Sequence, residues 1–207
     1  MFFAFFWGKK TNMKIGLITF ADSARSAAHN QALHEEVEKY IASIFSEPSQ
    51  FVSTVIEQDP KLLRKAIIDL CDKEKCPLVL TLGGTGPGPN DFVPDVTIEA
   101  MDRKLPGFGE IMRYYSYERF KVSVLSRAEA GVRGQTLVIN LPAKPRPAKF
   151  CLRLLQEGIA EALEQIAGIT VALKGDEIVI PIDKYLPFLK KIRPKSDPSG
   201  DKHPLIK

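Results

Sequence analysis

Residues 78–91 read LVLTLGGTGPGPND, a short apolar run that passes into glycines and prolines and then reaches an acid. Residues 77–82 predict a buried strand, because the run is short, continuous and bounded by turn residues. Glycine lets a backbone approach a ligand closely, since it has no Cβ and tolerates positive φ. Backbone N–H groups in such a loop can hold phosphate oxygens. The segment therefore indicates a ligand-binding loop, and the alternative left open is a tight strand-to-helix turn that binds nothing.

The loop matches neither common nucleotide-binding motif. No Lys-Ser or Lys-Thr follows the glycines, which excludes a P-loop, and the G-x-G-x-x-G spacing of dinucleotide-binding folds is missing. Asp91 ends the loop, where a carboxylate can bind a metal ion or position an attacking group. This acid is therefore the first candidate site residue.

Length and composition indicate a soluble globular protein. The chain has 207 residues, enough for one α/β domain, with 44% hydrophobic and 26% charged residues. The net charge of +4 is mild, and the basic run at 190–195 has no interleaved aromatic residues that could stack on bases. We expect a solvated tail there and no nucleic-acid partner.

The cysteines and histidines point away from metal or disulfide chemistry. Cys71, Cys76 and Cys151 form an odd set without metal-ligand spacing, which favours buried thiols in a reducing compartment. The three histidines form no cluster, and the sequence supports neither a zinc site nor a Ser-His-Asp arrangement. We therefore expect a cytoplasmic protein.

The two ends of the chain differ from its middle. Residues 1–12 begin MFFAFFW, which is too short to span a bilayer, and two lysines follow the apolar run without a cleavage site. We predict a dispensable extension before Met13, with a weak membrane-surface anchor as the alternative. The predicted domain covers residues 13–196, and residues 197–207 are expected to be a disordered tail.

Strand and helix patterns alternate along the domain. Apolar runs predict strands at 14–20, 50–56, 78–82 and 135–141, with a short strand-like run at 177–182. Helical spacing and helix-start signals predict helices at 32–45, from Pro60, from Pro94 to Met101, within 104–117 and at 147–166, with a loop or short helix at 123–131. The alternation predicts an α/β fold, a three-layer sandwich with a mostly parallel central sheet flanked by helices. The loops after the first four strands should meet at one cleft, because ligands bind beyond the carboxyl ends of such strands.

Several motifs occur in a specific order. They are residues 78–95 (LVLTLGGTGPGPNDFVPD), 105–113 (LPGFGEIMR), 125–128 (LSRA) and 140–142 (NLP), with Lys144 and Pro145 beyond, and 193–196 (RPKS) near the end. In this order they resemble the molybdopterin adenylyltransferase family of molybdenum cofactor biosynthesis, the MogA-like proteins, and the related MoaB proteins. The resemblance extends over residues 14–196.

The resemblance implies an activity and an assembly. Family members form a compact α/β domain, usually a homotrimer, and transfer AMP from ATP to the terminal phosphate of molybdopterin with release of pyrophosphate and the help of Mg²⁺. The product receives molybdate in a later step, which implies a molybdotransferase partner. Phe108, Ile111 and Met112 are the apolar residues that we expect at a subunit contact. The alternative function is a non-catalytic pterin- or nucleotide-binding protein of the MoaB-like fold.

The resemblance also implies roles for individual residues. Asp59 and Asp91 would be catalytic, and Asp91 would also hold the metal, because phosphoryl-type transfer needs positioning and charge neutralisation. The implied substrate contacts are Gly83, Gly84, Thr85, Gly86, Asp95, Glu110, Ser126, Arg127, Asn140 and Pro142. Structural alternatives stay open for some of these residues: Asp95 as a helix-stabilising charge, Glu110 as a cap or ion-pair partner, and Ser126-Arg127 as a turn.

The loop before Pro60 departs from the family pattern. Residues 56–60 read IEQDP, so Gln58 falls where the family's first acid belongs and Asp59 follows one position later. Pro60 biases Asp59 toward an extended conformation, in which neighbouring side chains point opposite ways. We predict that Asp59 replaces the first acid and faces the cleft near Asp91. In the alternative, Gln58 faces the cleft and Asp59 caps the next helix.

Two further departures favour the non-catalytic alternative. The first loop reads Ala21-Asp22-Ser23 and lacks the family's nearby arginine and glycine, although Asp22 is kept. Ala143 follows the NLP motif where the family favours glycine, which would restrict the loop if that position needs positive φ.

Overall fold

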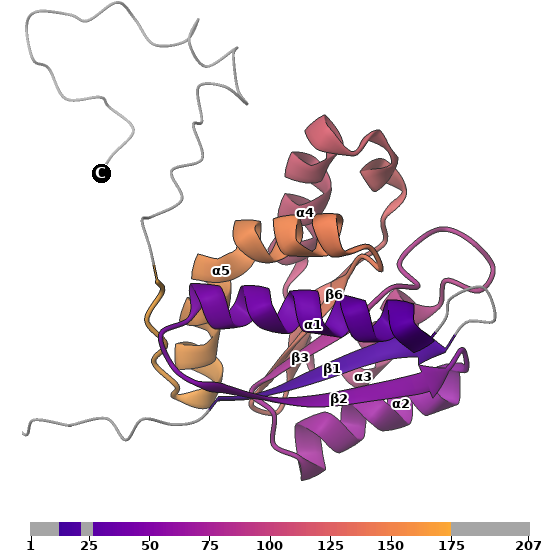
Figure 1. The fold of residues 1–207 in the computed structure, drawn as a ribbon. Helices are drawn as coiled ribbons and strands as arrows, with labels where there is room; N and C mark the ends of the chain where they lie inside the picture. The colour runs from indigo at the N-terminus through magenta and orange to yellow at the C-terminus, as the bar shows by residue number, and fades with distance from the viewer. Residues whose placement is uncertain (1–12, 22–26, 175–207) are drawn as a thin grey trace, which may run out of the picture. The chain divides into compact units, whose positions relative to one another are not determined.

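The computed structural model of the protein describes residues 13–21 and 27–174. Its centre is a six-stranded sheet in the order β2-β1-β3-β6-β5-β4 (Figure 1). The strands are β1 (Met13–Ala21), β2 (Ser49–Glu57), β3 (Leu78–Leu82), β4 (Arg103–Lys104), β5 (Ala130–Arg133) and β6 (Thr136–Leu141). The first four strands in this order pair in parallel, whereas β5 and β4 are antiparallel to their neighbours. The predicted mostly parallel sheet is confirmed.

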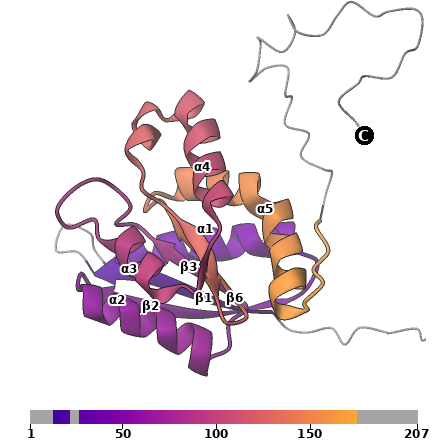
Figure 2. The same cartoon turned by 180° about the vertical axis from the view of Figure 1, so that it is seen from behind.

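Helices cover both faces of the sheet. They are α1 (Ala27–Ile44), α2 (Pro60–Ile68), α3 (Val93–Ala100), α4 (Pro106–Arg119) and α5 (Pro145–Ala167), with a π-helix η1 (Asp69–Lys73) and a 3₁₀-helix η2 (Lys121–Leu125). One apolar core lies between the sheet and α1, α4 and α5, and a second lies between the sheet and α2 and α3 (Figures 1 and 2). This arrangement confirms the predicted three-layer sandwich.

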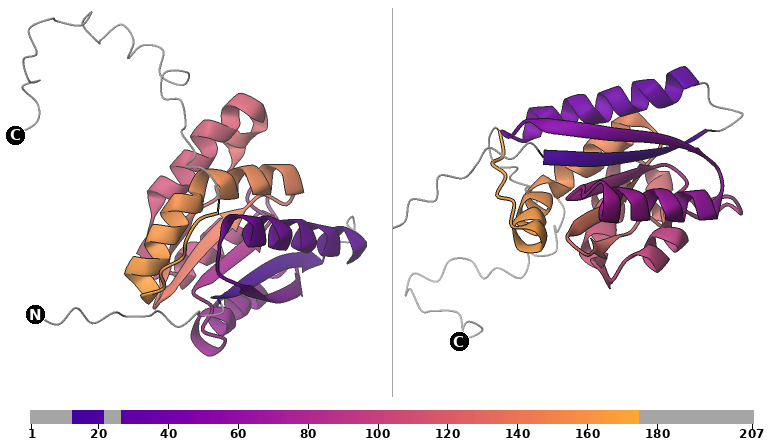
Figure 3. Two further views of the ribbon diagram at one scale, coloured as in Figure 1. Left: turned by 60° about the vertical axis from the view of Figure 1, so that its left-hand side comes forward. Right: turned by 90° about the horizontal axis from the view of Figure 1, so that it is seen from below.

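The central strands are apolar on both sides because both faces are covered. On β1, Ile15 and Leu17 enter the core under α1 and α5, and Ile18 enters the core under α2 and α3. Figure 3 shows α1 and α5 on the same face of the sheet, and an ion pair of 3.2 Å between Lys149 Nζ and Glu36 Oε2 joins them. The apolar residues that predicted these strands and helices are therefore the residues buried in the two cores.

The antiparallel end of the sheet was not predicted. β4 has two residues and β5 has four, and the prediction treated the β5 region as the end of a loop or short helix. Both strands are too short to show a periodic pattern, and they form only because β6 supplies a partner for β5. The predicted runs at 177–182 and 193–196, the extension at 1–12 and the tail at 197–207 lie outside the described residues, as does Asp22.

The structure also bears on the cysteines, the expected subunit contact and membrane-spanning helices. All three cysteines are free and buried, as predicted. Met112 is only 3% exposed and belongs to the core, so the expectation that it lies on an exposed subunit contact is wrong; Ile111 is exposed. No helix among the described residues is long and apolar enough to cross a membrane.

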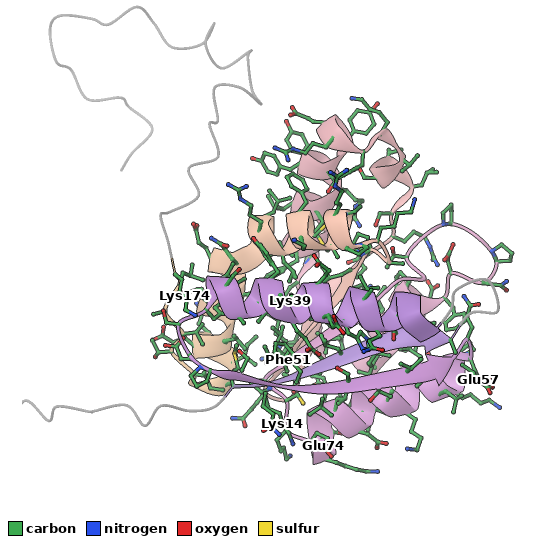
Figure 4. The ribbon with its side chains drawn as sticks, viewed as in Figure 1. Lys14, Lys39, Phe51, Glu57, Glu74 and Lys174 are labelled. Atoms are coloured by element: carbon green, nitrogen blue, oxygen red, sulfur yellow. The ribbon has the colours of Figure 1, made fainter. Side chains whose placement is uncertain are left out.

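An ion pair fastens η1 to the amino end of the sheet. Lys14 Nζ lies 2.5 Å from Glu74 Oε2 and also donates to the Glu74 carbonyl at 3.1 Å (Figure 4). The hydrogen bond to Glu74 is the main cause that raises the pKa of Lys14. Glu57, labelled in Figure 4, is the last residue of β2. It marks the carboxyl edge of the sheet, where the predicted site loops begin.

His34 on α1 gives a testable pH dependence. Its side chain is 7% exposed, and Nε2 has no hydrogen-bond partner among the described residues. Burial lowers its pKa below 6.5, against a smaller opposing effect of Glu38. Below about pH 6.5 the unfolded chain therefore binds a proton that the native state resists, so stability falls as the pH falls. We expect His34→Leu to flatten the loss of unfolding free energy between pH 7.5 and 5.5, measured by urea titration; an unchanged pH slope in the variant contradicts this.

Candidate active site

A cavity of about 430 Å³ opens at the carboxyl ends of β3 and β6. Three parts of the chain form its walls: the loop after β3, the segment from α4 through η2, and the loop between β6 and α5. Its lining consists of Gly83, Gly84, Thr85, Gly86, Pro87, Asp91, Met112, Arg113, Ser116, Phe120, Val122, Ser123, Leu125, Ser126, Ala128, Pro142, Ala143, Lys144, Pro147 and Cys151. The cavity thus collects the glycine loop, Asp91, Ser126 and Pro142 of the predicted site.

The glycine loop turns sharply at its start. Gly83 and Gly84 have φ values of 109° and 62°, in the region that side chains rarely adopt. The Gly83 N–H donates to the Leu141 carbonyl at 2.9 Å, which ties the loop to the end of β6. Among the hydrogen bonds of the described residues, none uses the N–H of Gly84, Thr85 or Gly86 as a donor. The described residues therefore supply no acceptor for three consecutive N–H donors of the cavity-lining loop.

The loop closes around the Asp91 carboxylate. Oδ2 accepts the Gly88 N–H at 3.0 Å, and the Asp91 N–H donates to the Gly88 carbonyl at 3.0 Å. A Cβ placed on Gly86 would lie 2.6 Å from Asp91 Oδ2. Glycine at this position therefore leaves room for the acid beside the cavity.

The wall made by α4 and η2 is largely apolar. Met112, Phe120, Val122 and Leu125 line it, and η2 leaves Val122 and Leu125 exposed. Cys151 of α5 also lines the cavity, and burial raises the pKa of its thiol to about 11, so the thiol stays neutral. Sequence reasoning missed this wall, because a single 3₁₀ turn carries no periodic signal.

Two cations at the cavity were also missed as site residues. Arg113 Nη1 donates to the Ala128 carbonyl at 2.8 Å, and its Nη2 lies 3.5 Å from Glu129 Oε1. Lys144 lies in the loop between β6 and α5. Both residues lie in the motif regions quoted above, and those motifs are the sequence signal that could have identified them as site residues. Asp91 is the one acid among the described lining residues, and cations such as Arg113 and Lys144 at the same wall suit phosphates.

Arg127 and Asp95 pair with each other. Arg127 donates from Nη1 and Nη2 to the two carboxylate oxygens of Asp95, both at 2.9 Å. These bonds lower the pKa of Asp95. Both residues are described, and neither is among those that line the cavity. The substrate contacts expected from Arg127 and Asp95 therefore stay a prediction.

Of the other predicted substrate contacts, Ser126 lines the cavity and Asn140 does not. Ser126 lines the cavity, and its Oγ accepts the Ala128 N–H at 3.3 Å. Asn140 is fully buried, and its Nδ2 donates at 2.9 Å to the hydroxyls of Thr81 and Thr97. It joins β6 to β3 and α3 and lies outside the cavity lining.

Glu110 is not among the residues that line the main cavity, although its own hollow shares Arg113 with it. It is an exposed residue of α4 and lines a separate hollow of about 570 Å³ together with residues of α4 and η2, among them Glu118 and Val124. The structure therefore does not bring Glu110 to the glycine loop.

Asp59 has the extended backbone that was predicted, with φ −129° and ψ 127°. Its Oδ1 accepts the N–H groups of Lys61 and Leu62 at 2.7 and 2.9 Å, so the carboxylate caps α2. Asp59 is absent from the cavity lining, and so is Gln58. The first-turn N–H groups of α2 hold the Asp59 carboxylate, as in the capping alternative, and its approach to Asp91 stays a prediction.

The fold and cavity define an α/β domain with a glycine loop at the carboxyl edge of its sheet. Residues 31–164 match the family model described as "Probable molybdopterin binding domain". The chain belongs to this family, that of the MogA-like and MoaB proteins of molybdenum cofactor biosynthesis, as the motifs predicted.

Individual relatives agree with this assignment. The chain is 32% identical over 154 residues to the molybdopterin adenylyltransferase of Helicobacter pylori, covering 74% of this chain and 88% of that protein. It is 34% identical over 150 residues to the molybdopterin adenylyltransferase of Escherichia coli K12, covering 72% and 75%. The solved structure of the molybdopterin biosynthesis enzyme MoaB from Thermus thermophilus superposes with a TM-score of 0.67 at 30% identity, covering 76% of this chain and 98% of that one.

Proposed function

We propose that this protein is a Mg²⁺-dependent molybdopterin adenylyltransferase that transfers AMP from ATP to molybdopterin and releases pyrophosphate. The observation that carries the proposal is the glycine loop: Gly84, Thr85 and Gly86 line a cavity together with Asp91, and their N–H groups donate to no other described residue. The names of the relatives supply the reaction and both substrates.

The reaction needs positioned charge more than covalent help. An oxygen of the terminal phosphate of molybdopterin attacks the α-phosphorus of ATP, and the bond to the β-phosphate oxygen breaks as pyrophosphate leaves. The N–H groups of the glycine loop bind phosphate oxygens, and Arg113 and Lys144 neutralise the charge that develops on them.

The residues at the cavity fit a metal ion that arrives with ATP. The described residues contain no group of three or more His, Cys, Asp or Glu side chains that could form a complete protein cage. Mg²⁺ typically uses one or two carboxylates together with substrate phosphates, and Asp91 provides one carboxylate at the wall. When bound there, the ion would neutralise phosphate charge.

The test is release of pyrophosphate from ATP that depends on molybdopterin and on Mg²⁺. We expect turnover with the purified full chain, and none when molybdopterin is omitted. A folded, metal-supplied protein that releases no pyrophosphate overturns the proposal.

A second candidate, a non-catalytic pterin- or nucleotide-binding protein, is favoured by one observation. The described part of the cavity lining holds a single acid, whereas the family pattern calls for two. Calorimetric binding of molybdopterin without AMP transfer would support this candidate over the enzyme.

The catalytic role of Asp59 stays a prediction that one substitution tests. Asparagine caps a helix about as well as aspartate but lacks its charge. Because Asp59 caps α2 and is absent from the cavity lining, we expect Asp59→Asn to keep its stability and its turnover within about threefold. A loss of about a hundredfold or more with unchanged stability would restore Asp59 as a catalytic acid.

We also propose a homotrimer. Exposed apolar side chains gather on α4 and η2, among them Ile111, Val122 and Val124, and such a surface suits a subunit contact. Light scattering at micromolar concentration should give three times the 23.0 kDa chain mass. A stable monomer under these conditions contradicts the assembly.

A further inference from the structure

The Arg127 side chain holds the glycine loop at two points. Nε donates to the Gly86 carbonyl at 2.9 Å, and Nη2 donates to the Asp91 carbonyl. The backbone N–H of Arg127 adds a third point by donating to the Thr85 carbonyl at 2.8 Å. These bonds bracket the part of the loop that lines the cavity.

Asp95 fixes the orientation of the guanidinium. It lies in the first turn of α3, and both of its carboxylate oxygens accept bonds from Arg127. A guanidinium is planar and presents its donors in a rigid fork, so a bidentate partner sets its plane. Arg127 and Asp95 therefore connect the loop to α3, which is a more rigid element than the loop itself.

We propose that Arg127 is a positioning residue for the AMP-transfer reaction: its guanidinium, oriented by Asp95, holds the backbone of Gly86 and Asp91 so that the Asp91 carboxylate stays at the cavity wall. This inference rests on the proposed function. Nε, Nη1 and Nη2 are all engaged by the protein, so the side chain has little left to offer a phosphate.

A direct substrate contact would behave differently from this clamp. A residue that binds substrate loses affinity when it is removed, which raises the KM or the Kd for ATP or molybdopterin. A residue that positions the loop lowers kcat and, when removed, lets the loop amides exchange faster, whereas loss of a direct contact leaves the loop as it was. In the same way, Asp95→Asn would free a substrate-binding arginine and tighten binding, whereas it would loosen a clamp.

The experiment combines kinetics with hydrogen exchange of the full chain. We expect Arg127→Gln to lower kcat by at least about thirtyfold, because small misplacements of reacting groups have large effects on rate. We expect amides in residues 83–93 to exchange at least about tenfold faster, because the loop bonds made by the Gly83, Gly88 and Val93 N–H groups then open more often. Arg127→Lys, which keeps the charge but not the fork, should fall between Arg127→Gln and the wild type.

A double-mutant cycle tests the role of Asp95. Asp95→Asn should lower kcat by about fivefold in the wild type and by less than about twofold in the Arg127→Gln background, since the two residues act as one unit. Arg64→Gln on the exposed face of α2 is the matched control, and it should change neither kcat nor exchange.

Each outcome decides between the two ideas. A raised KM or Kd with unchanged exchange overturns the clamp and returns Arg127 to substrate binding. Unchanged kcat and unchanged exchange in Arg127→Gln also overturn it. If the wild type releases no pyrophosphate, the proposed function fails, and the exchange data alone still show whether Arg127 holds the loop.

Discussion

Asp91→Asn should lower the rate of pyrophosphate release by at least about a hundredfold, the scale of a lost electrostatic contact in a transition state. Asparagine has nearly the same shape, and its carbonyl oxygen can still accept the Gly88 N–H that now bonds to Oδ2. The loop should therefore keep its conformation, and only the negative charge at the cavity wall is lost. The measurement is steady-state turnover at saturating ATP and Mg²⁺, with the free energy of unfolding measured in parallel.

Asp102→Asn is the matched control for this variant. Asp102 Oδ2 accepts the N–H of Gly134, in the turn between β5 and β6, at 2.6 Å, so it is an acid that holds a glycine N–H, as Asp91 does, but outside the cavity lining. We expect it to leave turnover unchanged. Near-normal activity of Asp91→Asn would mean that this acid only closes its turn.

Gly84→Ala should lower the free energy of unfolding by about 2–3 kcal/mol, through a backbone strain of about 1 kcal/mol and a steric clash in the core. The φ of Gly84 is 62°, and an added Cβ would lie 2.5 Å from Val93 Cγ2. Val93 is 1% exposed and begins α3, so it has little room to move. Urea unfolding measures the change, and activity should fall as well because the loop must shift.

Gly134→Ala separates the two causes. Gly134 has a similar φ of 55°, but an added Cβ would meet nothing within 4 Å. This control should lose only about 1 kcal/mol, the contribution of the backbone conformation. If the two variants lose equal stability, the contact with Val93 is not the reason that position 84 needs glycine.

The sequence by itself determined the fold class, the glycine loop and the family. These features are local: strands buried on both faces are continuously apolar, helices repeat every 3.6 residues, and a turn with positive φ needs glycine. The cap made by Asp59 is also local, since an acid directly before Pro60 at the start of a helix is a capping signal. It was recognised only as the alternative to a catalytic role, because the family pattern pointed the other way.

Only the tertiary structure decided which polar residues reach the cavity. Arg127 meets Asp95 across 32 residues and Gly86 across 41, and Asn140 meets Thr81 across 59. A polar side chain bonds to whatever partner the packed fold brings within about 3 Å, and a sequence pattern does not contain that distance. β5 likewise needed β6 as a partner, and the apolar wall of η2 needed the cavity beside it. The motif residues could therefore be identified in the sequence, but only the fold decided which of them line the cavity and which support it.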